Sequence, residues 1–428
     1  MNFDLVLYSS KRHILCMLIL SRLIRASKRD AKFRASWGWQ WTSTPYKSTF
    51  DRNTSNERSL KRNKCDAMAT QIDVMENVMK EVYGNWDDPK SGFPIPMPRT
   101  EAGPDWEPNA KSPTCQRRYL WTDSFGILNF ITLSHRAQSE EKRKKLLDAA
   151  QKLADVTAKT LGTPRSDRLS MLPNSSGGYK GMRIGKEEAK VMSDAGMSYD
   201  GMYWHYIDKW IYANLRLSQA KGEPPSYIAE FIKEIHPYFL KKDKNGQPVG
   251  IYWKMNCDLS VIDGLEDTEP NRDAFDGWLM YNLVHRVYPI LEKEIKELEY
   301  VVKNYVESGL RATSDPLGYG LIWWSYQWVK GRKVEASKQQ LKKLASMALD
   351  IRHGRQLPFR LYGAIIGGKL SLDSNIVALA NKSLDHMKEY EMNNKIGSPH
   401  STINKVMFAT ALDPFAFQKY SDDTIFEV

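Results

Sequence analysis

The sequence predicts an all-α fold, an (α/α)6 toroid of six helical hairpins, and two patterns along its 428 residues lead to this prediction. Helices that are apolar or aromatic on nearly all sides alternate with amphipathic helices. The chain is also rich in aromatic residues, with 13 Trp and 21 Tyr, which suits a large core. A helix that is apolar all round needs neighbours on both sides, and an inner ring of such helices inside an outer ring provides them. An irregular α-solenoid is the alternative, although its repeats would share a length and these do not.

The expected hairpins follow one another through residues 67–428. Residues 119–133 are apolar or aromatic throughout, and residues 139–161 form an amphipathic helix with Leu146, Leu153 and Leu161 on one side. The same couple recurs four times, at 199–218 with 226–240, 276–290 with 292–306, 317–329 with 337–352, and 359–366 with 374–390. Residues 401–412 are expected to pair with the first helix, residues 71–83, which completes six couples. The turn signal Asn245-Gly246 predicts one short β-hairpin.

The basic charge of the chain is concentrated in residues 1–66. This segment carries 14 Lys and Arg against 5 Asp and Glu, a net charge of +9, which leaves +2 for residues 67–428. A nearly neutral domain argues against nucleic acid as a partner. We expect residues 1–66 to be a disordered basic leader, a targeting segment or a mis-assigned start, with Met68 opening the domain.

The four cysteines are widely spaced and contain no Cys-x-x-Cys pair, which favours a reducing compartment. No apolar run approaches the ~20 residues that a membrane-spanning helix needs, so we expect a soluble protein without stable membrane insertion. A cytoplasmic location is expected, or a mitochondrial one if the leader is genuine. The oligomeric state is not predicted.

Two links between couples are long, residues 162–198 and 241–275, and long loops are usually functional or disordered. Together they contain Tyr, Trp, Met, Arg and Gly, a composition that argues against disorder. Because both lead into the starts of inner helices, we expect them to meet on one rim of the ring.

Four runs in this region resemble a known family. They are RRYLWTDSFGILNF (117–130), GMRIGK (181–186), DGMYWHYIDKWIYA (200–213) and YWKMNCDLS (252–260). They resemble an uncharacterised bacterial and fungal family of the six-hairpin glycosidase-like superfamily, over roughly residues 110–412. The resemblance implies an (α/α)6 fold in a superfamily of glycoside hydrolases, sugar epimerases and polysaccharide lyases. It supplies no catalytic residues, because fold does not fix function.

Glycoside hydrolysis usually needs two carboxyl groups, and three aspartates at inner-helix starts are the catalytic candidates. Asp123 lies in an apolar helix, where burial would raise its pKa, or where it pairs with Arg117 or Arg118. Asp200 opens an aromatic helix and is either the second carboxylate or a helix N-cap. Asp276 is held in reserve. The neighbouring Asp208 is expected simply to pair with Lys209 or Arg216.

The expected substrate-binding residues lie in the same motifs. His205 orients the substrate or acts on it, although a lone histidine in an aromatic helix is more often a core residue. The sugar-stacking candidates are Trp121, Tyr203, Trp204 and Trp253, and the cationic candidates are Arg183 and Lys254. No metal or cofactor is predicted, since the acidic residues of the second long loop lack the EF-hand spacing.

These candidates predict a glycoside hydrolase-like enzyme that acts on an oligosaccharide or an acidic sugar. A sugar epimerase or isomerase that exchanges a proton through His205 and His400 is one alternative. A non-catalytic helical scaffold or sugar-binding protein is the other.

Overall fold

The computed structural model describes residues 70–97, 117–164, 170–186, 199–262, 271–355, 357–393, 400–421 and 423–428. The expectations for residues 1–66 therefore lie outside the described part of the chain. Residues Lys64–Val428 form one compact unit, to which all described residues belong. They are mostly helical, and their few strands form short two-stranded sheets, which confirms the all-α prediction.

The helices follow the predicted couples closely. They are α3 (Leu120–Arg136) and α4 (Glu140–Leu161), α5 (Trp204–Lys221) and α6 (Ser226–Phe239), α7 (Asn271–Val287) and α8 (Glu292–Ser308), α9 (Pro316–Ser325) and α10 (Arg332–Ala348), α11 (Pro358–Leu370) and α12 (Ser374–Asn393), and α13 (Ser401–Leu412). A further helix covers residues 70–83. It contacts α13 through an ion pair between Glu81 and Lys405.

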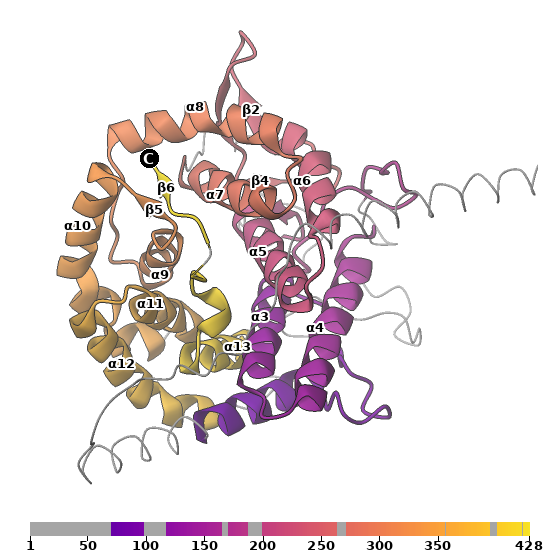
Figure 1. The fold of residues 1–428 in the computed structure, drawn as a ribbon, viewed down its shortest axis with the longest axis vertical. Helices are drawn as coiled ribbons and strands as arrows, with labels where there is room; N and C mark the ends of the chain where they lie inside the picture. Colours follow the sequence, from indigo (N-terminus) through magenta and orange to yellow (C-terminus); the bar gives the residue numbers. More distant parts are fainter. Residues whose placement is uncertain are drawn as a thin grey trace, which may run out of the picture. The chain divides into compact units, whose positions relative to one another are not determined.

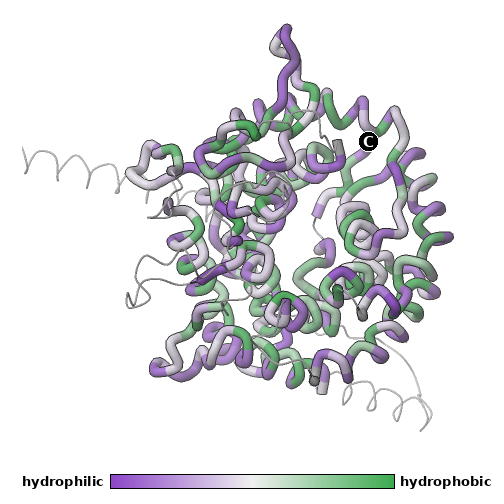
Figure 2. The backbone as a smooth tube through the Cα atoms, turned by 180° about the vertical axis from the view of Figure 1, so that it is seen from behind, coloured by the Kyte–Doolittle hydropathy of each residue, from purple (hydrophilic) through white to green (hydrophobic). Residues whose placement is uncertain are grey.

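The two kinds of helix differ in burial as their sequences predict. Every residue of α3 from Leu120 to Ser134 is buried. In α4 the buried residues form one stripe that includes Leu146, Leu153 and Leu161, and Ser139 caps the helix by accepting from the Lys142 amide. Hydrophilic and hydrophobic residues accordingly alternate along the peripheral helices (Figure 2).

The first members of the couples pack side by side (Figure 1). Helix α3 packs against α5 and α13, α5 against α7, α9 against α11, and α11 against α13. Arg272 of α7 joins α9 by donating to the Leu321 carbonyl oxygen and the Ser325 hydroxyl. Helices α3, α5, α7, α9 and α11 each also contact the helix that follows them in their couple.

Three short sheets connect the couples. The predicted turn at Asn245-Gly246 joins β2 (Leu240–Lys242) to β3 (Pro248–Ile251) in an antiparallel hairpin. β1 (Met202–Tyr203) pairs with β4 (Lys254–Met255), and β5 (Val329–Lys330) pairs in parallel with β6 (Phe426–Glu427). The last two pairings join segments far apart in the sequence, so local patterns did not reveal them.

Several helices begin or end a few residues away from the predicted bounds. Helix α7 starts at Asn271 rather than residue 276, and α10 starts at Arg332 rather than residue 337. Helix α5 starts at Trp204 rather than residue 199, because the preceding residues are extended and pair with β4. Helix α9 ends at Ser325 rather than at residue 329, because Val329 pairs with Phe426.

Helices α9 and α11 approach each other very closely at Gly320, where an added Cβ would lie 2.0 Å from the Gly363 carbonyl oxygen.

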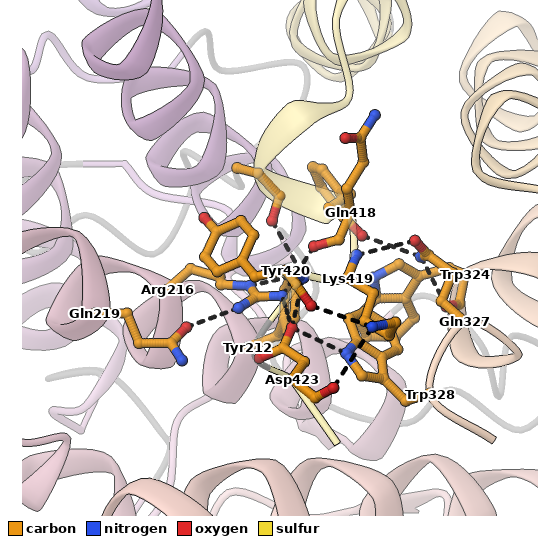
Figure 3. A network of polar contacts seen from close by, with 12 residues as sticks. Tyr212, Arg216, Gln219, Trp324, Gln327, Trp328, Gln418, Lys419, Tyr420 and Asp423 are labelled. Carbon is orange, nitrogen blue, oxygen red and sulfur yellow. Dashed lines mark hydrogen bonds and ion pairs between the residues drawn. The ribbon is translucent and has the colours of Figure 1, made fainter. Parts of the chain in front are cut away.

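The C-terminal segment after α13 is held by a polar network around Arg216 of α5 (Figure 3). The Arg216 Nη2 donates to the Gln418 carbonyl oxygen at 2.9 Å and to Asp423 Oδ2 at 2.8 Å. The same Asp423 oxygen accepts from Trp328 Nε1 and from the Tyr420 amide. This network ties α5 and the end of α9 to one segment.

Candidate functional site

The described parts of the two long loops meet beside the starts of α3 and α5, as the sequence predicts. The Ile184 carbonyl oxygen accepts from the Leu120 amide, and the Ile184 amide donates to the Gly201 carbonyl oxygen. The Trp204 amide at the start of α5 donates to the Trp253 carbonyl oxygen. Most candidates from the four motifs therefore lie in one region of the molecule.

Asp123 lies in a closed ion pair with Arg118, and both side chains are fully buried. The Arg118 Nε donates to Oδ2 at 2.8 Å and Nη2 donates to Oδ1 at 2.5 Å, while the Thr157 hydroxyl donates to Oδ2 at 2.9 Å. The guanidinium also donates to the Ile95 carbonyl oxygen. Such bidentate pairing with matched hydrogen bonds is the arrangement that stabilises a buried carboxylate.

Asp200 is held in a second buried pair, whose partner is the predicted substrate-binding residue Arg183. Arg183 Nη1 donates to Oδ2 at 2.8 Å, and the Gly185 amide donates to Oδ1 at 2.7 Å. The other guanidinium nitrogens donate to the Thr163 and Thr160 carbonyl oxygens. Asp200 thus fixes the glycine-rich loop to the start of β1, and it does not cap α5.

An aromatic group lines the neighbouring faces of α3 and α5. The Trp121 ring stacks on Phe125 and lies 5.3 Å from the Tyr206 ring and 6.3 Å from the His205 ring. The hydroxyls of Tyr119 and Tyr206 are 2.5 Å apart. Trp121 is buried, whereas His205 and Tyr206 are partly exposed.

His205 is neutral at physiological pH, because burial and then the Lys209 charge lower its pKa to about 3. His400 lies at the start of α13, where burial and the Lys186 charge lower its pKa as well. The Lys186 ammonium lies 5.1 Å from the Tyr119 ring, so His400 and the aromatic group share a region.

The remaining aromatic candidates occupy different environments. Trp204 is completely buried against Phe239 and Tyr281, so it has no exposed face on which a sugar could stack. Tyr203 is also buried, and Trp253 is partly exposed. The Lys254 side chain lies among aromatic rings rather than beside an acid.

A cluster of charged groups lies between α5, α7 and α9, and it combines the reserve catalytic candidate Asp276 with residues that were not predicted as a site. Asp208 pairs with its neighbour Lys209, whose Nζ donates to both carboxylate oxygens at 2.8 Å. This pairing is the one expected from the sequence. The Lys209 ammonium also lies 4.2 Å from the Trp324 ring. Burial raises the pKa of Asp208 to about 7, against the opposing effect of Lys209.

Helix α7 contributes two carboxyls and an arginine to this cluster. Asp276 accepts from Arg272 Nε at 2.9 Å and from the Ser325 hydroxyl at 2.7 Å. Asp273, one turn earlier, accepts no hydrogen bond from any described residue and is only 8% exposed. Burial, and then the charges of Asp208 and Asp276, raise its pKa well above the ordinary value.

Among the described residues, the cluster contains three carboxyls and two cations, Lys209 and Arg272. Each cation is paired with one carboxylate, so the third carboxyl has no counter-ion in the described part of the chain. A buried acid in this position retains its proton at a pH at which exposed aspartates are ionised. The pKa of Asp273 is therefore raised well above that of an exposed aspartate.

The sequence did contain a signal for this cluster. Within the aromatic helix α5, His205, Lys209, Tyr212 and Arg216 recur at helical spacing, which places a polar stripe on one buried face. Buried polar residues need partners, so such a stripe marks a polar interior. The position of Asp273 and Asp276 opposite that stripe depends on tertiary packing.

Two surface pockets lie away from these candidates. One of about 610 Å³ is lined by the β2–β3 hairpin and α8, and another of about 320 Å³ by residues around Pro316 and Arg360. Among the described residues, no group of three or more His, Cys, Asp or Glu is arranged to hold a metal. None of the described helices is long and apolar enough to cross a membrane.

Comparison with known proteins adds little to this description. The chain matches no protein-family model, so the resemblance of the four runs stays a prediction. No curated protein matches its sequence. Among solved structures it is similar to a sugar epimerase from a ruminal bacterium, with a TM-score of 0.42 and 12% identity, over 79% of this chain and 98% of that chain.

Proposed function

We propose that this protein is a carbohydrate-active enzyme, similar to glycoside hydrolases, whose acid/base groups lie in the cluster between α5, α7 and α9. The observation that carries the proposal is Asp273, a mostly buried carboxyl without a hydrogen-bond partner among the described residues. A general acid must hold its proton at working pH and give it up on demand. The raised pKa of Asp273 suits this role, whereas both oxygens of Asp123 and of Asp200 accept hydrogen bonds from their own partners.

The second role falls to Asp208. In glycoside hydrolysis one carboxylic acid protonates the leaving oxygen while a carboxylate activates water or attacks the sugar. Burial raises the pKa of Asp208, and the Lys209 ammonium opposes this by stabilising the ionised carboxylate. Arg272 and Ser325 hold Asp276, which positions α7 against α9.

The substrate is proposed to be an oligosaccharide. Partly exposed His205 and Tyr206, backed by Trp121, provide the aromatic surface on which sugars stack. An acidic sugar fits less well, because the cation expected to receive it, Arg183, is engaged by Asp200 and by backbone carbonyls. The proposed architecture is the six-hairpin toroid over residues 67–428, and the return of the helix contacts from α13 to α3 supports it.

Substitution of the two aspartates tests this function. The full-length chain and its Asp273→Asn and Asp208→Asn variants are assayed against oligosaccharides and aryl glycosides, with Asp243→Asn in the exposed hairpin as the control. We expect each cluster variant to lower kcat by at least about a hundredfold, the usual value of a positioned acid or base. The kcat of the control variant Asp243→Asn should equal that of the wild type. Wild-type rates in Asp273→Asn would refute the assignment, and no turnover of any glycan by the wild-type chain would refute the hydrolase function.

An isomerase or epimerase is the second candidate, because His205 and His400 both have lowered pKa values and are therefore in the proton-accepting form. Such an enzyme removes a proton from a sugar carbon and returns one to carbon, so a C–H bond is broken and re-formed while glycosidic bonds stay intact. Incubation of reducing sugars in D2O distinguishes the two, since only the isomerase incorporates deuterium at carbon. His205→Gln should abolish that incorporation, and its persistence would exclude His205 as the base.

A further inference from the structure

Lys254 is a buried amine that lacks, among the described residues, the partners normally found around a buried charge. It is 2% exposed, and its Nζ has no hydrogen-bond partner in the described part of the chain. The ammonium position lies 4.0 Å from the Tyr199 ring, 4.7 Å from the Tyr203 ring and 5.8 Å from the Trp253 ring. The Tyr199 hydroxyl donates to the Met255 carbonyl oxygen and the Tyr203 hydroxyl to the Tyr199 carbonyl oxygen, so these donors are directed away from the amine.

Such an aromatic cage stabilises an ammonium only in part. Cation–π attraction provides about 0.5–2 kcal/mol, whereas loss of hydration from a charged group costs several kcal/mol. The balance favours the neutral amine, and burial lowers the pKa of Lys254 to about 8. At pH 7 the nucleophilic form of Lys254 is therefore more abundant than that of an ordinary lysine by a factor on the order of a hundred.

The position of Lys254 is also fixed by the backbone. It lies in β4 opposite Tyr203 of β1, and β1 leads directly into the start of α5 and His205. One wall of the cage, Trp253, is partly exposed, so the amine lies just beneath the surface beside the aromatic group of α3 and α5. Lys209 differs, because its buried ammonium is paired with both oxygens of Asp208.

We propose that the Lys254 amine is a covalent site for small carbonyl compounds, such as the open-chain aldehyde form of a sugar. The neutral nitrogen adds to the carbonyl carbon to give a carbinolamine, which loses water to form an imine with Nζ. The aromatic rings exclude water and lie against the aldehyde carbon chain. This site is separate from the proposed acid/base cluster and does not require hydrolysis.

Reductive trapping tests the proposal. The full-length protein is incubated briefly with glycolaldehyde and cyanoborohydride at pH 7, and the modified lysines are quantified by peptide mass spectrometry. We expect Lys254 to be modified at least about tenfold faster than exposed Lys293 and Lys296, although it is buried. The ratio of the Lys254 labelling rate to that of the exposed lysines should fall as the pH rises toward 10, because ordinary lysines also lose their protons there.

Two controls keep the result unambiguous. The Lys254→Arg variant should lose the fast-reacting site and retain the slow ones, and circular dichroism reports whether it folds. Excess free glycine, which competes for the aldehyde in solution, should reduce labelling at all sites equally. Labelling of Lys254 at or below the level of the exposed lysines would overturn the proposal, and this comparison uses only the wild-type chain.

Discussion

Asp273 differs from the other buried aspartates of the protein in what surrounds it. Asp123 and Asp200 each face an arginine and accept hydrogen bonds on both oxygens. Asp273 faces two further carboxyls, and its own charge would be unfavourable. Ionisation of a buried aspartate is therefore favourable at Asp123 and Asp200 and unfavourable at Asp273. A structural pair is most stable when charged, and an unpaired acid is most stable when protonated.

We predict that Asp273→Asn stabilises the protein as it removes activity. The native carboxyl holds a proton that the unfolded chain releases, so its contribution to stability is present below the unfolded pKa and is lost as the pH rises. An amide is neutral at every pH and avoids this loss. At pH 8 we expect the variant to gain about 1–2 kcal/mol in the free energy of unfolding. At pH 4 the gain should be close to zero.

Urea unfolding at both pH values measures this effect. Asp123→Asn serves as the contrasting variant, since it breaks a buried bidentate pair and should lose about 3 kcal/mol. Equal losses in the two variants would show that Asp273 is ionised and paired in the folded protein.

At the scale of single elements, the polar stripe of α5 connects the different parts of the interior. His205 contacts Trp121 of α3, Lys209 lies over Trp324 of α9, and Arg216 binds the C-terminal segment. The stripe was readable from helical spacing alone. The partners of each residue were not, because they come from other helices.

The backbones of helices α9 and α11 lie very close to each other. An added Cβ at Gly320 would lie 2.0 Å from the Gly363 carbonyl oxygen, and one at Gly367 would lie 2.3 Å from the Gly320 Cα. No side chain can yield there, because the obstructing atoms belong to the backbone. The two helices are therefore able to touch only where both lack side chains.

We predict that Gly320→Ala destabilises the protein by about 2–3 kcal/mol, although alanine favours helix formation. The helices must separate to admit the methyl group, and the contacts of α9 with α7 that hold Asp276 should loosen as well. Thermal unfolding measures the effect. Gly178→Ala is the control, since its Cβ would meet only the Asn174 side chain at ordinary distances. A variant as stable as the wild-type protein would mean that the two helices are not held at this distance.

At the scale of the whole molecule, the C-terminal segment joins elements that are remote in sequence. It contacts α3 through the rings of Phe417 and Phe125, α5 through Arg216, and the end of α9 through Trp328. Because these contacts have large sequence separation, they are established only when the domain is assembled. The segment therefore stabilises the arrangement of α3, α5 and α9 as a unit (Figure 3).

We predict that Asp423→Ala lowers the free energy of unfolding by about 3 kcal/mol at pH 7, because it leaves the buried Arg216 without a carboxylate. Burial raises the pKa of Asp423, but the Arg216 charge and hydrogen bonds outweigh this and leave it below its usual value. Its contribution is therefore present above the unfolded pKa and is lost as the pH falls through the folded one.

Urea unfolding at pH 7 and pH 3 measures this contribution. The difference in the free energy of unfolding between the wild type and Asp423→Ala should be smaller at pH 3. Glu427→Ala is the matched control in the same segment, since its pair with Lys330 is exposed and should contribute little. A loss in Glu427→Ala as large as that in Asp423→Ala would contradict the role of the buried pair.

The sequence by itself determined the helical class, the couples and most helix boundaries, because burial patterns at helical spacing are local properties of the chain. It also indicated the region where the long loops meet. The pairs of Asp123 with Arg118 and of Asp208 with Lys209 were among the alternatives that the sequence offered, whereas the tertiary structure decided between those alternatives and paired Asp200 with Arg183. Asp123 and Asp200 resemble catalytic acids in their local sequence, but Arg118 and Arg183 are positioned to neutralise them. Asp273 has no such partner among the described residues. Charge interactions depend on distance in space, which residue spacing does not specify between helices.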